Sequence, residues 1–342
     1  MLIEGGYLVS KFIVIKPSYM QLYPIPALYC PFPGAIHPLY EEIEEHTYQW
    51  ILEFQLTPNY EVFSRYRAYR YPLFIARSFP KGDYSNVCTW CDFYMLLFIV
   101  SDIFGEADII KRKESYGAFE GEFMEILEHN KRCRIKRDGP LLAALSDFWR
   151  RITMCTSKSW QFKFIGGVKL MFRSQAWQFR HLISGVQPDL DEYMYMRQYL
   201  MGTHLSTDCL EVTGKIFLGE NIYEHAFVRK LTELSRKILC ISNDLFSLSK
   251  DLSREDRESE YNFVIILRDK YRSSIEDAIQ RAATIHDGLV NEFIDLARRS
   301  FIFDDLTNHM LKKYIEALGY QMRGNVDWST RETTRYPHIQ MN

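Results

Sequence analysis

The sequence predicts an all-α protein built as one helical bundle. Apolar residues recur at i, i+3, i+4 and i+7, the spacing of one helix face, in windows 40–54, 119–130, 141–155 and 275–297. Alternating apolar and polar runs joined by Asn-Gly or Asp-Gly turns, the signal of β-hairpins, are nearly absent. No low-complexity linker interrupts the chain after residue 40, so we predict a single domain over residues 39–337.

The segment before this domain has a different composition. Between residues 20 and 40 lie Pro24, Pro26, Pro31, Pro33, Pro38 and Gly34. This density of proline excludes a regular helix, so we expect residues 1–38 to form an extended arm over the domain. No charged leader runs into a continuous apolar stretch, so the arm does not resemble a secretory signal. Residues 338–342 are expected to form a short tail.

The composition of the 342 residues excludes several classes of protein. With 47% hydrophobic and 25% charged residues, the chain matches an ordinary globular protein. The 42 basic and 44 acidic side chains create no positive field for a nucleic acid. The longest apolar run, residues 95–100, is far shorter than the ~20 residues of a membrane span, so no stable membrane insertion is expected. Seven cysteines without paired spacing indicate a reducing compartment, the cytoplasm.

Two helices carry polar residues at chemically useful positions. Pro188 followed by Asp189, Asp191 and Glu192 predicts a helix start, which places Arg197 about two turns into that helix. Asn243, Ser247 and Asp251 recur every four residues, so on a helix their oxygens form one stripe. Such oxygens suit Mg²⁺, and the apolar residues just upstream indicate that the stripe faces a cavity. An exposed polar helix end would show the same spacing.

The wider pattern favours the metal site. Residues 243–251 resemble the Asn-Asp-x-x-Ser-x-x-x-Glu/Asp motif of class I terpene cyclases, with Asp251 as an allowed variant of the usual Glu. Arg335 and Tyr336 resemble the terminal Arg-Tyr signature of the bacterial members, and Arg197, 46 positions before Asn243, matches the diphosphate-sensing arginine of the family. Pro-Phe-Pro at residues 31–33 is similar to its N-terminal arm. The resemblance covers roughly residues 20–337.

The resemblance implies a fold, a reaction and a set of site residues. The fold is the class I terpene synthase (isoprenoid synthase) bundle with a central active-site cavity. The reaction is the Mg²⁺-dependent ionisation of a linear isoprenyl diphosphate and its cyclisation to a sesqui- or diterpene. The metal ligands would be Asp102, Glu106, Asn243, Ser247 and Asp251; the catalytic residues Arg197, Arg335 and Tyr336; and the further substrate contacts Lys250, Phe98 and Trp328. Phe93 and Tyr94 are weaker candidates for the cavity wall, because core packing explains them equally well.

The first metal motif of the family, Asp-Asp-x-x-Asp, is incomplete. Aligned on Phe98, the three expected acids fall on Ser101, Asp102 and Gly105, and Glu106 follows one position later. Asp102 and Glu106 share one helical face and could supply one or two metal ligands. The family's roughly three Mg²⁺ ions could therefore be fewer in this protein.

Other functions stay open at this stage. The damaged first motif would also fit a lyase or hydrolase that gives a linear or alcohol product, or a non-catalytic protein that binds isoprenyl diphosphates. A chain-elongating prenyltransferase is disfavoured, because such enzymes use two Asp-rich motifs. The sequence does not separate farnesyl from geranylgeranyl diphosphate, and it leaves a homodimer possible.

Two further patterns resemble sites and have plainer explanations. Cys88 and Cys91 form a CxxC, but their aromatic neighbours indicate a buried helix, and no second pair follows at zinc spacing. Asp304 and Asp305 follow the Asn243 motif instead of preceding it, so we expect them to start a helix by capping.

Overall fold

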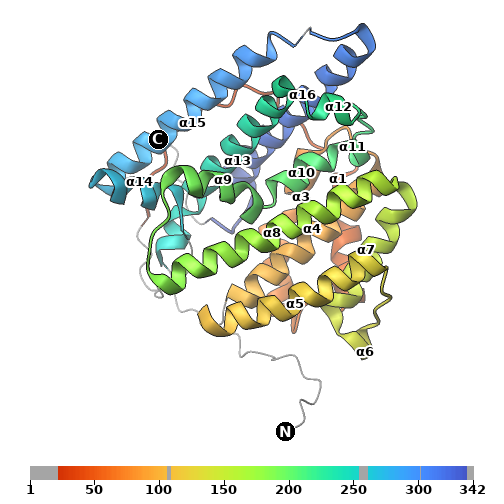
Figure 1. Ribbon diagram of the computed structural model, residues 1–342. Helices are drawn as coiled ribbons and strands as arrows, with labels where there is room; N and C mark the ends of the chain where they lie inside the picture. The colour runs from red at the N-terminus through yellow and green to blue at the C-terminus, as the bar shows by residue number, and fades with distance from the viewer. Residues whose placement is uncertain (1–21, 106–108, 254–260, 301, 337–342) are drawn as a thin grey trace.

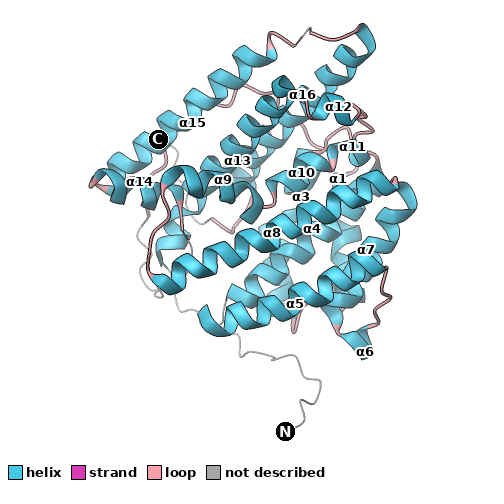
Figure 2. Ribbon diagram, in the orientation of Figure 1, coloured by secondary structure: helices cyan, strands magenta, loops and turns pink. Residues whose placement is uncertain are grey.

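The computed structural model describes residues 22–105, 109–253, 261–300 and 302–336. Within these ranges the chain is helical and contains no β-strand beyond a bridge residue at Ile25 (Figure 2). The all-α prediction is confirmed. The helices are α1 (Tyr40–Glu53), α2 (Tyr60–Tyr69), α3 (Tyr71–Ser78), α4 (Tyr84–Gly105), α5 (Ile109–His129), α6 (Ile135–Asp138), α7 (Pro140–Cys155), α8 (Lys158–Ser184), α9 (Leu190–Leu200), α10 (Thr203–Asp208), α11 (Leu210–Thr213), α12 (Glu220–Tyr223), α13 (Ala226–Ser253), α14 (Phe263–Tyr271), α15 (Ile275–Ala297), α16 (Asp305–Asp327) and a π-helical turn, η1 (Trp328–Glu332).

The helix starts follow local capping chemistry. Asp189 caps α9, its carboxylate accepting from the N–H groups of Asp191 and Glu192, so Pro188 lies just before the cap and not inside the first turn as expected. Asp304 caps α16 by accepting from the N–H of Thr307, as predicted for this acidic pair.

Two parallel helices, α13 and α16, form the centre of the bundle (Figure 1). Thr232 bonds to Tyr314 (2.8 Å between hydroxyl oxygens), and ten residues further along α13, Ser242 accepts from Asn325 Nδ2 at 2.9 Å. The contacts therefore advance in the same direction along both helices. α15 covers α13 on one side, while α4 packs between α1, α3 and α7. The C-terminal ends of α4, α13 and α16 meet at one end of the bundle, because Arg335 beyond η1 reaches Asp102 of α4.

Much of the high aromatic content packs the core behind α4 and lines no cavity. Phe93 stacks on Phe148 with ring centroids 4.4 Å apart, and Trp90 meets Trp160 and Phe164 edge to face. Phe93 is therefore a core residue. The stretch Tyr84–Ile103 is long and apolar enough to cross a membrane, but 67% of it is buried inside the fold, as in the core helix of a globular protein.

The described part of the arm, residues 22–38, runs as extended chain over the domain. Arg323 Nη1 of α16 donates to the carbonyl of Cys30 (3.2 Å), and the N–H of Tyr29 donates to Asp287 of α15 (2.9 Å). The N–H of Tyr23 donates to Ser249 Oγ in α13, close to the metal motif (3.2 Å). The arm therefore ties α13, α15 and α16 together at the end of the bundle where the motif lies.

Candidate active site

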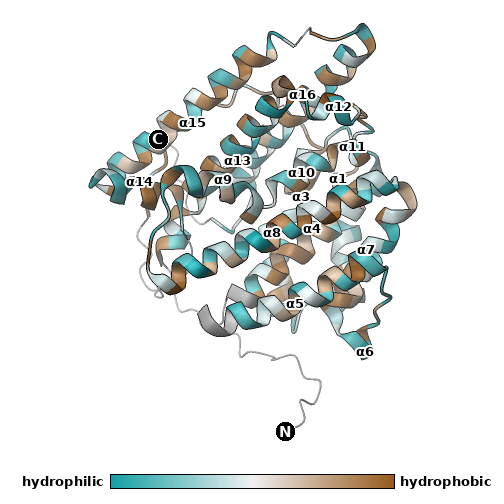
Figure 3. Cartoon of the chain, viewed as in Figure 1, coloured by the Kyte–Doolittle hydropathy of each residue, from teal (hydrophilic) through white to brown (hydrophobic). Residues whose placement is uncertain are grey.

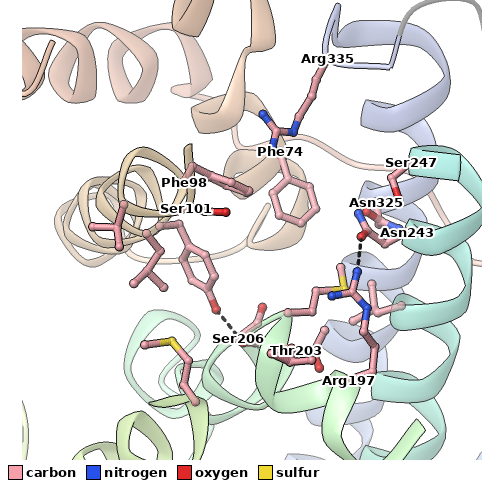
Figure 4. Close-up of a pocket in the computed structure, with 18 of the residues that line it drawn as sticks. Phe74, Phe98, Ser101, Arg197, Thr203, Ser206, Asn243, Ser247, Asn325 and Arg335 are labelled. Atoms are coloured by element: carbon pink, nitrogen blue, oxygen red, sulfur yellow. Dashed lines mark hydrogen bonds between the residues drawn. The ribbon is translucent and has the colours of Figure 1, made fainter. Parts of the chain in front are cut away.

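One pocket gathers nearly all the residues that the sequence singled out (Figure 4). Its lining includes residues near the C-terminal ends of α4, α13 and α16, the part that we call its mouth, and the rest of its walls comes from α3, α5, α8, α9 and α10. The predicted residues that line it are Phe98, Arg197, Asn243, Ser247, Lys250, Asp251, Trp328, Arg335 and Tyr336. Segments as far apart as residues 98 and 336 thus contribute to one cavity, as the resemblance implied.

The stripe on α13 faces this pocket. Ser247 Oγ donates to Asp251 Oδ2 at 2.6 Å, and Asn262 Nδ2 donates to the same oxygen at 3.0 Å. Asn243 Nδ2 donates to the hydroxyl of Tyr336 (3.2 Å). The three side chains are therefore held in place by their neighbours, with their oxygens on one side of the helix.

These residues fit a divalent cation. Asp251 Oδ1 is buried and has no hydrogen-bond partner in the described part of the chain, although Lys250 Nζ lies 3.6 Å away. A buried carboxylate oxygen without a hydrogen bond is costly unless a cation balances it. The donors beside it are an amide and a hydroxyl oxygen, which are ligands that Mg²⁺ accepts.

Arg197 is anchored beside the stripe by a residue that the sequence did not single out. Asp244 Oδ1 accepts from Arg197 Nε at 2.9 Å and from Nη2 at 2.6 Å, and Arg197 Nη2 also reaches Asn243 Oδ1 (3.2 Å; Figure 4). Asp244 Oδ2 accepts from Tyr193 Oη (2.6 Å) and the N–H of Phe263 (2.9 Å).

Asp244 is 1% exposed, and this burial raises its pKa. The charge of Arg197 and the hydrogen bonds from Tyr193 and the N–H of Phe263 oppose the increase. Burial lowers the pKa of Arg197, but the charge and hydrogen bond of Asp244, together with Tyr193 and Cys240, outweigh burial and hold that pKa well above its usual range. The guanidinium is therefore a fixed positive charge at the mouth of the pocket.

Arg335 occupies the opposite side of the mouth. Its Nη2 lies 3.5 Å from Asp102 Oδ1, and its guanidinium carbon lies 5.4 Å from the ring centres of Tyr69 and Tyr71. Phe98 stacks on Tyr71 at 3.7 Å. The arginine is thus held over an aromatic cluster, and its charge is partly matched by Asp102.

The other predicted residues of the mouth have defined partners as well. Trp328 Nε1 donates to the carbonyls of Tyr69 and Arg70, both at 3.0 Å, which leaves the indole ring as an apolar wall. Burial raises the pKa of Tyr336, so its hydroxyl stays protonated as a hydrogen-bond donor. Ser101 lines the pocket where the family places an acid, and Glu106 lies outside the described residues.

The CxxC pair, Cys88 and Cys91, is structural. Cys88 and Cys91 are buried in α4, where burial raises the pKa of Cys88 to about 11 and that of Cys91 well above the ordinary thiol value. Reactive thiols have lowered pKa values, so this CxxC is unsuited to redox chemistry. Nowhere in the described ranges do three His, Cys, Asp or Glu side chains cluster as a metal site.

Comparison with known proteins identifies relatives over most of the chain. A family model described as "Terpene synthase family 2, C-terminal metal binding" matches residues 92–292. The chain is 26% identical to a germacrene A synthase of Nostoc punctiforme over 92% of its own length and 96% of the relative's. It is 27% identical to a (+)-T-muurolol synthase of Roseiflexus castenholzii over 90% and 92%. The crystal structure of SVS_A2, from ancestral sequence reconstruction, is similar in fold, with a TM-score of 0.79 at 23% identity over 91% of both chains.

Proposed function

The chain belongs to terpene synthase family 2, and from this premise we propose that it ionises farnesyl diphosphate with Mg²⁺ and closes the carbocation into a cyclic terpene. As a terpene synthase it is a carbon–oxygen lyase. One observation carries the proposal: the oxygen stripe of α13 and two partly exposed arginines, Arg197 and Arg335, meet at the mouth of one aromatic pocket. The mouth is suited to a diphosphate and the interior to a hydrocarbon chain.

The residues at the mouth would bind the leaving group. Asn243, Ser247 and Asp251 would hold Mg²⁺, which when bound neutralises the charge that develops on the departing diphosphate. Arg197, Arg335 and Lys250 supply positive charge beside it, and the arginine forks match phosphate oxygens geometrically. Tyr336 would donate a hydrogen bond to the same group.

On the α4 side, Asp102 is proposed to supply the carboxylate, and Glu106 stays a second candidate from the sequence. Ser101 and Gly105 replace two acids of the family motif, so this side offers fewer ligands than α13. Asp102 also faces Arg335 at 3.5 Å, and this arginine competes with a metal ion for its oxygen. We therefore propose that fewer than the usual number of ions bind, and that diphosphate oxygens complete their coordination.

The walls of the pocket would protect the cation. Phe98, Phe74, Trp328 and Phe179 present aromatic surface to the cavity, and a ring face stabilises a cation by about 0.5 to 2 kcal/mol. Desolvation by these walls strengthens the electrostatic interactions at the mouth and limits premature quenching by solvent.

The choice of farnesyl over geranylgeranyl diphosphate rests on the relatives. The muurolol synthase, similar over 90% of this chain, is described as cyclising (2E,6E)-farnesyl diphosphate. We also propose that the enzyme works in the cytoplasm, a proposal supported by its seven free cysteines. A homodimer stays a prediction from the sequence.

The test is incubation with Mg²⁺ and each of the farnesyl and geranylgeranyl substrates, followed by gas chromatography and a diphosphate assay. We expect diphosphate release with a cyclic product from the farnesyl substrate. A linear product would instead identify an ionising lyase or hydrolase, and binding without release of diphosphate a non-catalytic binding protein. Turnover of the longer substrate alone would contradict the proposed chain length.

A further inference from the structure

The inner end of the pocket is polar, although a hydrocarbon chain would occupy it. Tyr94 of α4, Thr203 and Ser206 of α10, and Gln321 of α16 line the pocket, and we call this part of its wall the pocket floor. Figure 4 shows Thr203 and Ser206 on the side of the pocket away from Arg335. Gln321 lies four residues before Asn325, which bonds to Ser242 beside the metal stripe. Four residues of helix correspond to about 6 Å, so Gln321 lies roughly one turn deeper than the stripe.

Gln321 is fixed with its amide oxygen unused. The side chain is 1% exposed, and its Nε2 donates to the carbonyl of Ser206 at 2.9 Å, which sets the orientation of the amide. Its Oε1 is buried and has no hydrogen-bond partner among the residues that the structure describes. Leaving a buried acceptor unpaired costs about 1 to 3 kcal/mol. The floor therefore favours a ligand that donates a hydrogen bond.

The neighbouring groups on the floor are also arranged as acceptors. The Tyr94 hydroxyl donates its proton to the carbonyl of Gly202 (3.3 Å), and the Thr203 hydroxyl donates to the carbonyl of Gln198 (3.0 Å). The Ser206 hydroxyl interacts with the Tyr94 phenol, while its carbonyl binds Gln321, so Ser206 brings Tyr94 and Gln321 to the same place. Because the Tyr94 and Thr203 hydroxyls direct their protons to backbone carbonyls, each can still accept a hydrogen bond, whereas the Ser206 hydroxyl is engaged with Tyr94.

An isoprenyl chain cannot satisfy these acceptors, because it carries only C–H groups. Water can, since it donates two hydrogen bonds and is small enough to share the pocket with a substrate. We infer that the floor, through Gln321 Oε1 and Tyr94 Oη, holds a water molecule that captures the cyclised cation, so that the product is a cyclic terpene alcohol. The inference rests on the proposed function and specifies its last step.

The step balances as a hydration. A lone pair of the water oxygen forms the new C–O bond to the cationic carbon, and the resulting oxonium loses one proton to the diphosphate released in the first step. Gln321 accepts a hydrogen bond from the water and orients it, but takes up no proton. The net reaction converts isoprenyl diphosphate and water to a cyclic alcohol and diphosphate, and Gln321 is a positioning residue.

The experiment follows product and diphosphate together. The wild-type enzyme is incubated with farnesyl diphosphate and Mg²⁺ in water enriched in oxygen-18, and the products are separated by gas chromatography with mass detection. We expect a cyclic alcohol as the main product, with the heavy oxygen incorporated. A hydrocarbon alone, or an alcohol without the heavy oxygen, would overturn the inference while the release of diphosphate still supported the proposed function. No release of diphosphate would overturn both.

Variants of Gln321 test the residue itself. Gln321→Met keeps the volume and removes the acceptor, so the ratio of alcohol to hydrocarbon should fall about tenfold, with diphosphate release preserved. Gln321→Glu in its protonated form keeps one donor and one acceptor and should restore the alcohol. An unchanged ratio in Gln321→Met would contradict the assignment.

Two further variants keep the test decisive. Gln161→Met alters a buried glutamine outside the pocket whose amide is fully bonded, and it should leave the ratio unchanged. A fall as large as that of Gln321→Met would count against the assignment. Should Gln321→Met fail to fold, Tyr94→Phe removes one acceptor while keeping the ring, and we expect a smaller fall of about threefold. If the ratio does not fall in that variant, Tyr94 does not hold the water, and the proposal that two acceptors bind it at the pocket floor is wrong.

Discussion

The two sides of the pocket mouth differ in how completely they are built for a metal ion. On α13, Asn243, Ser247 and Asp251 form a continuous stripe, and Asp251 Oδ1 has no hydrogen-bond partner in the described structure. On α4, Asp102 is the one carboxylate of the first metal motif within the residues that the structure describes, and it faces the guanidinium of Arg335. Each carboxylate faces one basic side chain at a similar distance, Lys250 Nζ at 3.6 Å from Asp251 and Arg335 Nη2 at 3.5 Å from Asp102. The two sides differ instead in ligand number, because α13 presents three oxygen-bearing side chains and α4 presents one carboxylate in the described structure.

This difference favours α13 as the main protein support for a metal ion. Mg²⁺ prefers several oxygen ligands, so a helix that offers three oxygen-bearing side chains can hold it better than a helix that offers one carboxylate. We therefore expect metal affinity to depend mainly on α13 and on the diphosphate that arrives with the substrate. The following predictions test this asymmetry.

The largest effect is expected from the α13 stripe. Asn243→Ala or Asp251→Ala should reduce product formation by at least about 100-fold, because each removes a proposed ligand without touching the hydrophobic core. Product analysis measures the loss, and circular dichroism checks the fold. Asp305→Ala, which removes an exposed acid at the start of α16, is the matched control and should keep wild-type turnover. Near-wild-type activity in either stripe variant would exclude metal ligation by that residue.

The two arginines should govern diphosphate binding. Inorganic diphosphate with Mg²⁺ should stabilise the folded enzyme by about 2.7 kcal/mol at 100 times its Kd, raising the melting temperature. An Arg197→Lys, Arg335→Lys double variant keeps both charges but loses the forked geometry, and most of the shift should disappear. A full shift in this variant would show that neither guanidinium contacts the ligand.

A chelator should have a related effect. Treatment with EDTA should abolish turnover and the diphosphate-induced shift together, because diphosphate is expected to bind as its Mg²⁺ complex. Thermal denaturation with and without added Mg²⁺ measures this. A shift of equal size in EDTA would mean that the arginines bind diphosphate without the metal.

On the α4 side, the two acids should differ in importance. Asp102→Asn should cost far more activity than Glu106→Gln, on the order of tenfold against little change, because Asp102 occupies a motif position and also holds Arg335. Steady-state turnover at saturating Mg²⁺ measures both. The reverse ranking would mean that this helix is aligned in the wrong register, and full activity in both variants would mean that it binds no metal.

The smallest effect is expected from rebuilding the first motif. Ser101→Asp combined with Gly105→Asp restores the missing acids and should lower the Mg²⁺ concentration for half-maximal activity by a few-fold. Ser101→Asn with Gly105→Asn is the uncharged control. An equal response in both would show that the added charge is irrelevant, and the two sides of the mouth would then not differ as described.

The sequence predicts what lies along one helix and misses what lies between helices. The stripe of α13 and the Arg-Tyr pair are local motifs, so their resemblance to family signatures indicated the site before the structure. Asp244 stood inside the same motif, yet its bonds to Arg197 and Tyr193 depend on how α9 packs against α13. Gln321 carries no motif signal, and only the tertiary structure places its oxygen at the pocket floor.

The central claim is that α13 carries the metal site, and one measurement tests it directly. Crystals grown with Mn²⁺ and inorganic diphosphate would locate each ion by its anomalous scattering. We predict an ion coordinated by Asn243, Ser247 and Asp251 together with diphosphate oxygens, and Arg197 and Arg335 in contact with the same diphosphate. Ions bound at Asp102 alone, with none on the α13 stripe, would contradict the claim.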